Sequence, residues 1–240
     1  MRVEENQLDH LIFSHELKAV YCPVPKAGCS SWKAYLRQAI RLPKVDSRIL
    51  HDPERNGLTY AWMMHRETLL RALYGYPSYF RFVFLRNPYT RLASAYFDVV
   101  NPTERGGLRG AWWAETLLAL YSRSRDLRPS EAPSLSFEIF VRSLTLDNSL
   151  NRNRHWQPQT TITMPKLIRY DLVAKLEEID AHIEFIQQRL GCSEPMTFRL
   201  NPTNYPADVH DLYTPELKSI VQTDRQALSN LSSRQEATTA

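Results

Sequence analysis

The hydrophobic positions of this 240-residue chain form either short continuous runs or stretches with helical spacing. Continuous apolar runs are typical of strands buried on both faces, and they predict strands at residues 19–24 and 80–86. A third, short strand is predicted at residues 166–170. Apolar residues that recur every three or four positions predict helices at residues 30–41, 60–73, 88–100, 111–122, 137–146, 179–190 and 214–228. Strands that alternate with helices favour an α/β fold with a central, mainly parallel sheet flanked by helices.

Polar and turn-forming residues separate these elements. They predict loops at residues 43–57, 101–110, 124–133 and 201–211. Three helices have start signals, namely Asn87 before Pro88, Ser136, and Thr214 before Pro215. The length favours one domain over residues 1–240, and we expect residues 1–14 and 229–240 to be flexible.

Composition and charge change this picture little. Hydrophobic residues are 43% and charged residues 23% of the chain, which is ordinary for a globular protein. The net charge of +4 suits anionic ligands without identifying one. No run of about 18 apolar residues is present and the N-terminus lacks the apolar region of a signal peptide, so neither a membrane span nor secretion is expected.

The first segment with clear chemistry is YCPVPKAGCSSWKAYL, residues 21–36. An apolar run enters a proline-containing turn, followed by Lys26, Gly28, the hydroxyls of Ser30 and Ser31, and then a helical pattern. A strand, a tight turn and a helix N-terminus together make an anion site, because unpaired N–H groups and the helix dipole point outward there. The lysine precedes the glycine, so this is not the nucleotide-triphosphate motif.

The second such segment is RFVFLRNPYTRLASAYFDVV, residues 81–100. Its strand ends at Arg86, and Ser94 lies about two turns into the helix that follows. Ligands of open parallel sheets bind at the carboxyl ends of the strands. An arginine and a serine at that place can bind a phosphate, although a strand-end arginine can also serve in a structural salt bridge.

PKAGCSSW followed by FVFLRNPYTRLASAY resembles the carbohydrate sulfotransferases that use 3′-phosphoadenosine 5′-phosphosulfate (PAPS). The resemblance implies a P-loop-like, three-layer form of the α/β fold. It also implies that Arg86 and Ser94 bind the 3′-phosphate. The implied ligands of the 5′-phosphosulfate are the residues of the first motif: Pro25, Lys26, Ala27, Gly28, Cys29, Ser30, Ser31 and Trp32.

Two further segments extend the resemblance. HWQPQTTITMPKLIRYDLVAKLE, residues 155–177, is similar to a block of the chondroitin and dermatan 4-O-sulfotransferases, and residues 211–224 resemble the family's closing helix. The four segments span about residues 19–230. The resemblance therefore implies transfer of a sulfuryl group from PAPS to a carbohydrate hydroxyl, with release of adenosine 3′,5′-bisphosphate and with neither a metal nor nucleic acid involved.

The three cysteines, Cys22, Cys29 and Cys192, fit neither a disulfide framework nor a zinc pattern. Golgi members of the resembled family carry two cysteines in the third block, where this chain has Thr163 and Lys166. Without that pair and without a membrane anchor, we expect a soluble, cytoplasmic, bacterial member. Two interpretations stay open for Cys29, a spacer whose backbone N–H binds the anion or a redox-sensitive thiol.

Charge arguments assign roles within the segments. Negative charge grows on the bridging and leaving oxygens during transfer, and Lys26 is the cation that can stabilise it. The acceptor hydroxyl must lose a proton to a general base, for which His65 is favoured while His51, Glu67 and His155 stay open. Trp32 is either a core residue or a surface on which adenine stacks, and Trp156 is either core or part of a pocket wall.

Two other functions remain possible alternatives. A kinase-like phosphotransferase lacks the expected order of glycine and lysine, whereas a nucleotide- or polyanion-binding protein without turnover would share the same motifs. The sequence gives no indication of the oligomeric state. A set of arginines within and after the predicted helix at 88–100 either forms a solvated face or attracts an acidic glycan. Its members are Arg91, Arg105, Arg109, Arg123, Arg125 and Arg128.

Overall fold

The computed structural model describes residues 8–75, 79–100, 107–128, 131, 133–146, 153–192, 195 and 208–222, with side chains in helix α5 described from residue 112 onward. The chain divides into two compact units. Among the described residues, the first unit holds those up to Arg86 and those from Thr160 to 195. The second unit holds Asn87–Gln159 and residues 208–222.

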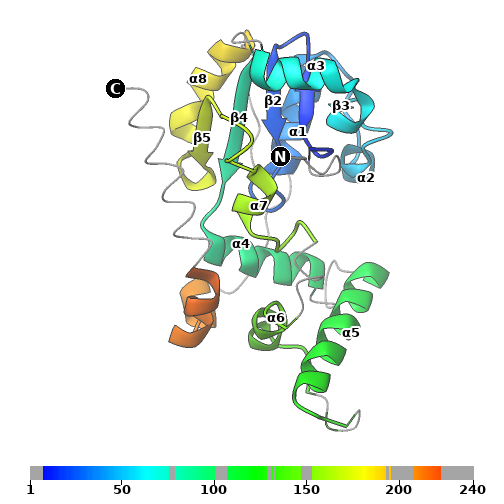
Figure 1. Cartoon of the computed structure of the whole chain (residues 1–240), viewed down its shortest axis with the longest axis vertical. Helices are drawn as coiled ribbons and strands as arrows, with labels where there is room; N and C mark the ends of the chain where they lie inside the picture. The colour runs from blue at the N-terminus through cyan, green and yellow to red at the C-terminus, as the bar shows by residue number, and fades with distance from the viewer. Residues whose placement is uncertain are drawn as a thin grey trace. The chain divides into compact units, whose positions relative to one another are not determined.

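A five-stranded sheet forms the centre of the first unit (Figure 1). Its strands, in the order in which they lie side by side, are β3 (Thr59–Tyr60), β1 (Ile12–Ser14), β2 (Ala19–Cys22), β4 (Phe80–Leu85) and β5 (Leu172–Lys175). β2 pairs with β4 and β4 with β5 in parallel, whereas β1 is antiparallel to both of its neighbours. The predicted α/β class with a central sheet is confirmed: the sheet is mixed, because β1 runs opposite to β2, β3, β4 and β5, which share one direction.

Helices cover both faces of this sheet. The side chains of Tyr21, Phe82 and Phe84 lie on one face, in a core shared with α1 (Cys29–Ala39) and α8 (Asp180–Leu190). On the other face the thiol of Cys22 lies 3.8 Å from the carbonyl oxygen of Ile162, in α7. The remaining helical elements of this unit are α2 (Ser47–His51), η2 (Ala61–Met63), α3 (Arg66–Leu70), η3 (Arg71–Gly75), α7 (Gln159–Thr163) and η7 (Leu176–Glu178).

Several predicted boundaries are wrong for tertiary reasons. Residues 166–170 form an irregular segment and not a strand, and β5 starts only at Leu172. The apolar residues Ile168 and Tyr170 of this segment are buried by tertiary packing without belonging to the sheet. Residues 8–14 are not a flexible end, since Leu11, Ile12 and Phe13 are buried and β1 pairs with two strands, while residues 1–7 and 229–240 lie outside the described residues.

Other differences concern helices. The predicted polar loop 43–57 contains α2, which Asp46 caps by accepting from the N–H groups of Arg48 and Ile49. The predicted helix at 60–73 is divided, because Tyr60 pairs with β1 before the helical turns begin. α5 starts four residues earlier than predicted, at Gly107.

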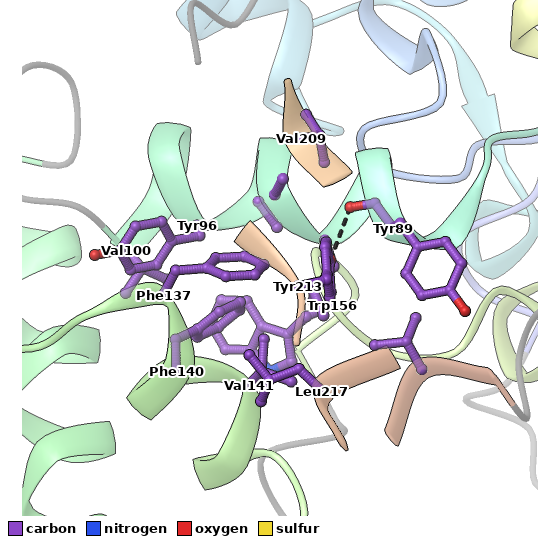
Figure 2. Packing of buried hydrophobic residues seen from close by; sticks show 14 of the residues in the cluster. Tyr89, Tyr96, Val100, Phe137, Phe140, Val141, Trp156, Val209, Tyr213 and Leu217 are labelled. Carbon is purple, nitrogen blue, oxygen red and sulfur yellow. Dashed lines mark hydrogen bonds between the residues drawn. The ribbon is translucent and has the colours of Figure 1, made fainter. Parts of the chain in front are cut away.

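The second unit is helical and has its own core (Figure 2). Its elements are α4 (Pro88–Ala95), η4 (Tyr96–Val100), α5 (Gly107–Ser124), α6 (Phe137–Ser143), η8 (Val209–Leu212) and a helix at residues 215–222. Trp156, Phe140 and Tyr96 meet edge to face or tilted in this core. The hydroxyl of Tyr213 donates to the carbonyl of Tyr89 at 2.9 Å, and burial raises the pKa of Tyr213, which keeps the phenol protonated as a donor.

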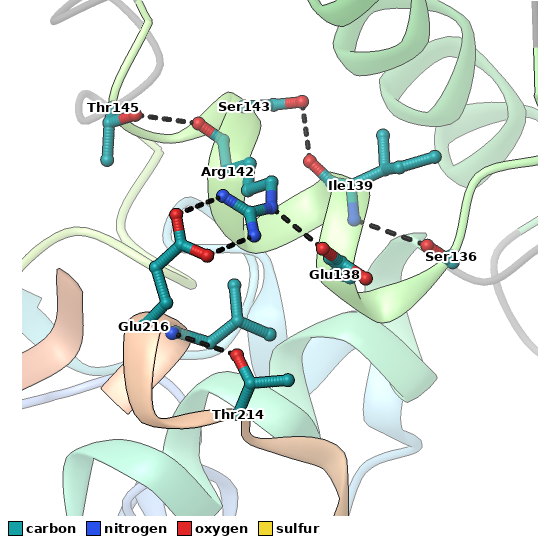
Figure 3. A network of polar contacts seen from close by, with 9 residues as sticks. Ser136, Glu138, Ile139, Arg142, Ser143, Thr145, Thr214 and Glu216 are labelled. Atoms are coloured by element: carbon teal, nitrogen blue, oxygen red, sulfur yellow. Dashed lines mark hydrogen bonds and ion pairs between the residues drawn. The ribbon is translucent and has the colours of Figure 1, made fainter. Parts of the chain in front are cut away.

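The predicted helix starts of the second unit are confirmed. Asn87 accepts from the N–H of Tyr89, with Pro88 in the first turn, and Ser136 accepts from the N–H of Ile139 (Figure 3). The hydroxyl of Thr214 accepts from the N–H of Leu217 at the start of the last helix. The predicted continuation over residues 223–228 lies outside the described residues, as do 201–207 of the predicted loop.

An arginine network links α6 to the last helix of this unit (Figure 3). The guanidinium of Arg142 donates two bonds to the carboxylate of Glu216, at 2.8 and 2.7 Å, and one to Glu138 at 2.8 Å. These hydrogen bonds lower the pKa of the Glu216 carboxyl. Across the described part of the chain, no helix combines the length and the apolarity that crossing a bilayer would require.

We expect Asp171→Asn to lower the free energy of unfolding by about 2 kcal/mol. The Asp171 carboxylate accepts from the backbone N–H of Arg81 at 2.7 Å and from its Nε and Nη2 at 2.9 Å each, which ties β4 to the segment before β5. An amide can replace only part of this pairing. Urea unfolding measures the loss. The control is Glu184→Gln, at an exposed position of α8, and an equal loss in both variants would contradict the prediction.

Candidate functional site

The loop after β2 has two residues in the left-handed region of the backbone. Lys26 has φ of 68° and Gly28 has φ of 77°. Between them Ala27 is fully buried, and its N–H donates to the carbonyl of Val24 at 3.1 Å. Left-handed backbone is uncommon for a residue with a side chain, and such strain concentrates at functional sites.

Gly28 is also the N-cap of α1, and it leaves the start of that helix open to an anion. No side chain caps α1 and its first turn contains no acidic residue, so its dipole and N–H groups are not offset by a protein carboxylate. A left-handed residue before right-handed ones is the backbone arrangement of anion-binding nests. The φ of 77° favours glycine at position 28, and a Cβ there would also lie 3.0 Å from Cδ1 of Leu176, a tight contact that the leucine would have to relieve.

Arg86 reaches the same loop from the end of β4. Its Nη1 donates to the carbonyl oxygen of Lys26 at 3.0 Å, and both residues are half-buried. The contact between Arg86 and Lys26 follows from the parallel pairing of β2 with β4, in which Cys22 lies opposite Val83. Parallel pairing brings the carboxyl ends of both strands to the same edge of the sheet. Two cationic residues and a helix N-terminus therefore converge on one turn.

The first residues of α1 differ in exposure. Cys29 and Ser30 are half-buried, whereas Ser31 is buried and Trp32 has no exposed surface. The Trp32 ring stacks on Phe84, with centroids 4.7 Å apart. It therefore anchors α1 to the sheet, and a ring so enclosed does not fit the alternative that adenine stacks on it.

Among the four candidate bases, His51 is in direct contact with the loop. Its Nε2 lies 2.9 Å from Oγ of Ser30. His65 is the exposed residue before α3, and the described contacts do not join it to the loop. Glu67 is exposed and pairs with Arg71.

The fourth candidate, His155, belongs to the second unit. Its Nδ1 and backbone N–H both bond to Oδ1 of Asn153. The neighbouring Trp156 is 4% exposed and packs on Trp113 and Phe140, which confirms the interpretation of Trp156 as a core residue.

Ser94 and Arg91 lie three residues apart in α4, also in the second unit, and both are buried. Arg91 is 3% exposed, so the expectation that it belongs to a surface basic set is wrong. Its guanidinium donates to the carbonyls of Gln157, at 2.9 Å, and Arg154, at 2.7 Å. Arg91 therefore fixes the segment that carries His155. Arg91 lies one helical turn before Ser94 in the second motif. This spacing was the sequence signal that could have indicated that both side chains lie on one buried face of the helix.

The chain is similar to known proteins over most of its length. A family model described as "Sulfotransferase family" matches residues 9–237. Carbohydrate sulfotransferase 14 of Danio rerio is 27% identical over 202 residues, which cover 82% of this chain and 53% of the relative. Carbohydrate sulfotransferase 14 of Homo sapiens is 29% identical over 175 residues, covering 72% and 44%. Carbohydrate sulfotransferase 11 of Mus musculus is 25% identical over 198 residues, covering 80% and 56%.

The chain thus spans about half the length of the curated relatives it matches. No solved structure matches it. The expectation of a cytoplasmic protein is wrong, because these relatives are carbohydrate sulfotransferases of the Golgi membrane type. That expectation rested on Thr163 and Lys166 in place of a cysteine pair and on the lack of an apolar anchor in this sequence. The bacterial source stays a prediction.

We expect Arg91→Lys to lower the free energy of unfolding by about 1–3 kcal/mol, because an ammonium group cannot reproduce a planar fork that serves two carbonyls. Urea unfolding followed by tryptophan fluorescence measures this. Arg123→Lys makes the same chemical change at an exposed position of α5 and should stay within about 0.5 kcal/mol of wild type. Equal stabilities of the two variants would show that the Arg91 fork is not needed.

Proposed function

We propose that this chain, which belongs to the sulfotransferase family, transfers a sulfuryl group from PAPS to a hydroxyl group of a carbohydrate. The observation that carries the proposal is the loop between β2 and α1. There the left-handed Lys26, the guanidinium of Arg86 and the uncapped start of α1 come together. The names of the relatives support a carbohydrate acceptor, and the third sequence block supports one of the chondroitin and dermatan type.

The donor groups of the loop fit a phosphosulfate. Such a group carries negative charge on several oxygens, and it needs cations and N–H groups held in fixed positions. We assign Pro25 to Trp32 to this role, in a P-loop-like manner, with the N–H groups of residues 28–31 as backbone donors. Trp32 contributes by anchoring the helix through its ring, which stacks on Phe84, while its own N–H donates to the carbonyl of Gly28.

The chemistry follows from where charge develops. The bond between sulfur and the bridging phosphate oxygen breaks, and a bond between sulfur and the acceptor oxygen forms. The electron pair of the broken bond stays on adenosine 3′,5′-bisphosphate. Lys26 stabilises the charge that grows on the bridging and leaving oxygens, while a general base takes the acceptor's proton.

For that base we now favour His51. Its contact with Ser30 holds an imidazole beside the loop, whereas His65, which the sequence favoured, stays the alternative. A histidine changes its protonation near neutral pH, which suits a group that accepts and then releases a proton.

The 3′-phosphate is assigned to Arg86 and Ser94, eight residues apart in the chain. Arg86 supplies a planar fork of donors and Ser94 a hydroxyl. The family match extends over residues from both units, which supports the prediction that residues 1–240 form one sulfotransferase domain.

Lys26→Ala should reduce transfer of labelled sulfate from PAPS by about 100- to 1,000-fold, with a smaller effect on the affinity for adenosine 3′,5′-bisphosphate, which lacks the sulfuryl group but keeps the 5′-phosphate. Arg86→Ala should do the reverse and weaken that affinity by about 10- to 100-fold, measured by calorimetry. The exposed Lys44→Ala is the control.

Each outcome of this experiment is informative. Full activity of Lys26→Ala would refute the assigned mechanism. Absence of bisphosphate binding to the wild-type chain would refute the whole proposal. Binding without turnover across a panel of glycans would instead favour the non-catalytic nucleotide-binding alternative.

His51→Ala should lower kcat by about 100-fold or more, because a positioned general base contributes that much, whereas His65→Ala should stay within about threefold of wild type. Steady-state sulfation at saturating PAPS measures both variants. The reverse pattern would return the role to His65.

A further inference from the structure

The sequence motif accounts for Ser30 but not for the histidine that contacts it. His51 lies 21 positions after Ser30 and is the last residue of α2, a helix of five residues. A helix this short has little stability of its own. The contact of 2.9 Å between His51 and Ser30 therefore depends on what holds α2 in place.

The side chain of Asn56 provides much of that support. It is 0% exposed, and its Nδ2 donates to the carbonyl of Leu50 at 3.1 Å and to the hydroxyl of Tyr60 at 2.7 Å. Its Oδ1 accepts from the N–H of Leu58 at 2.9 Å. A buried amide with donors and acceptor both satisfied fixes the groups around it, because losing any of these bonds leaves a buried polar group unpaired.

These bonds connect His51 to the central sheet. Leu50, whose carbonyl Asn56 holds, is the residue directly before His51. Tyr60 belongs to β3 and pairs with Ile12 of β1. Asn56 therefore joins the last turn of α2 to an element whose position is set by sheet hydrogen bonds.

Contacts from α1 hold the same segment from the other side. Nζ of Lys33 lies 5.8 Å from the centre of the Tyr60 ring. Further along α1, Nη2 of Arg37 donates to the carbonyl of Pro43 at 2.6 Å, and Gly57 has φ of 71° with Arg37 packed against it. The helix that begins with the anion loop and the segment that carries His51 thus share one scaffold.

We propose that Asn56 is a positioning residue of the transfer site: its amide holds α2 so that His51 keeps its contact with Ser30. The inference rests on the proposed function and extends it to a residue that touches neither donor nor acceptor. Its consequence is that Asn56 acts on transfer through His51 and not on its own.

A double-mutant cycle of Asn56→Ala with His51→Ala tests this consequence. Asn56→Ala alone should lower kcat by about 10- to 100-fold, as supporting residues of reactive groups commonly do, while calorimetry finds the affinity for adenosine 3′,5′-bisphosphate within about twofold of wild type. In the His51→Ala background the same substitution should change kcat by less than about twofold, although the melting temperature falls in both backgrounds.

A general effect on stability would give a different result. Ser143→Ala is the matched control, because Ser143 is also fully buried and donates to the carbonyls of Ile139 and Leu117 in the second unit. It should lower the melting temperature and leave kcat unchanged. Equal losses of kcat from Asn56→Ala in both backgrounds would overturn the proposal.

A second variant and a second readout make the test independent of turnover. Tyr60→Phe removes only one partner of the amide and should shift kcat in the same direction by a smaller factor. In nitrogen-15 spectra, the His51 ring should report one hydrogen-bonded tautomer in the wild type and a mixture in Asn56→Ala. A His51 signal that is the same in the wild type and in Asn56→Ala would overturn the proposal whether or not the chain sulfates a carbohydrate. A wild-type chain without any sulfation activity would refute only the proposed function.

Discussion

The bond from the Arg86 guanidinium to the Lys26 carbonyl is the contact on which the candidate site of the first unit depends. It joins the ends of β2 and β4, which run in parallel, and it holds the carbonyl of a residue whose left-handed backbone is costly. The charged donor strengthens the bond. The strain at Lys26 is thus stabilised by the same arginine that adds a second positive charge beside the loop.

This arrangement is useful for charge stabilisation because it is rigid before any ligand arrives. Preorganised donors stabilise developing charge well since they need not reorient during the reaction. The enclosed ring of Trp32 against Phe84 anchors α1, and the left-handed backbone of Gly28 sets the turn that precedes it. The contact between Ser30 and His51 joins the start of α1 to the end of α2.

The two arginines of the second motif show how one pattern can place similar residues in different roles. Arg86 directly follows β4 and is half-buried, and its Nη1 donates to the carbonyl of Lys26 in the loop before α1. Arg91, five positions later, lies inside α4, and its guanidinium donates hydrogen bonds to two backbone carbonyls. The first holds the loop between β2 and α1, and the second holds the segment that carries His155.

Much of the local structure was predictable. The apolar run before Arg86 and the prolines before Lys26 predicted a strand end and a turn, and Asn87 and Ser136 start helices as predicted. These signals are local, since strand burial, turn chemistry and capping depend on residues within a few positions of one another. β5 and the segment at 60–73 were mispredicted, because pairing with a neighbouring strand decided where each element begins.

The sequence by itself determined which residues could bind an anion and which strand and helix would present them. The tertiary structure decided which of them meet. Parallel pairing brought Arg86 to Lys26, burial made Arg91 a structural clamp, and the amide of Asn56 held His51 at Ser30. Each of these contacts joins residues whose meeting depends on packing and on pairing between elements, and local periodicity carries no information about that.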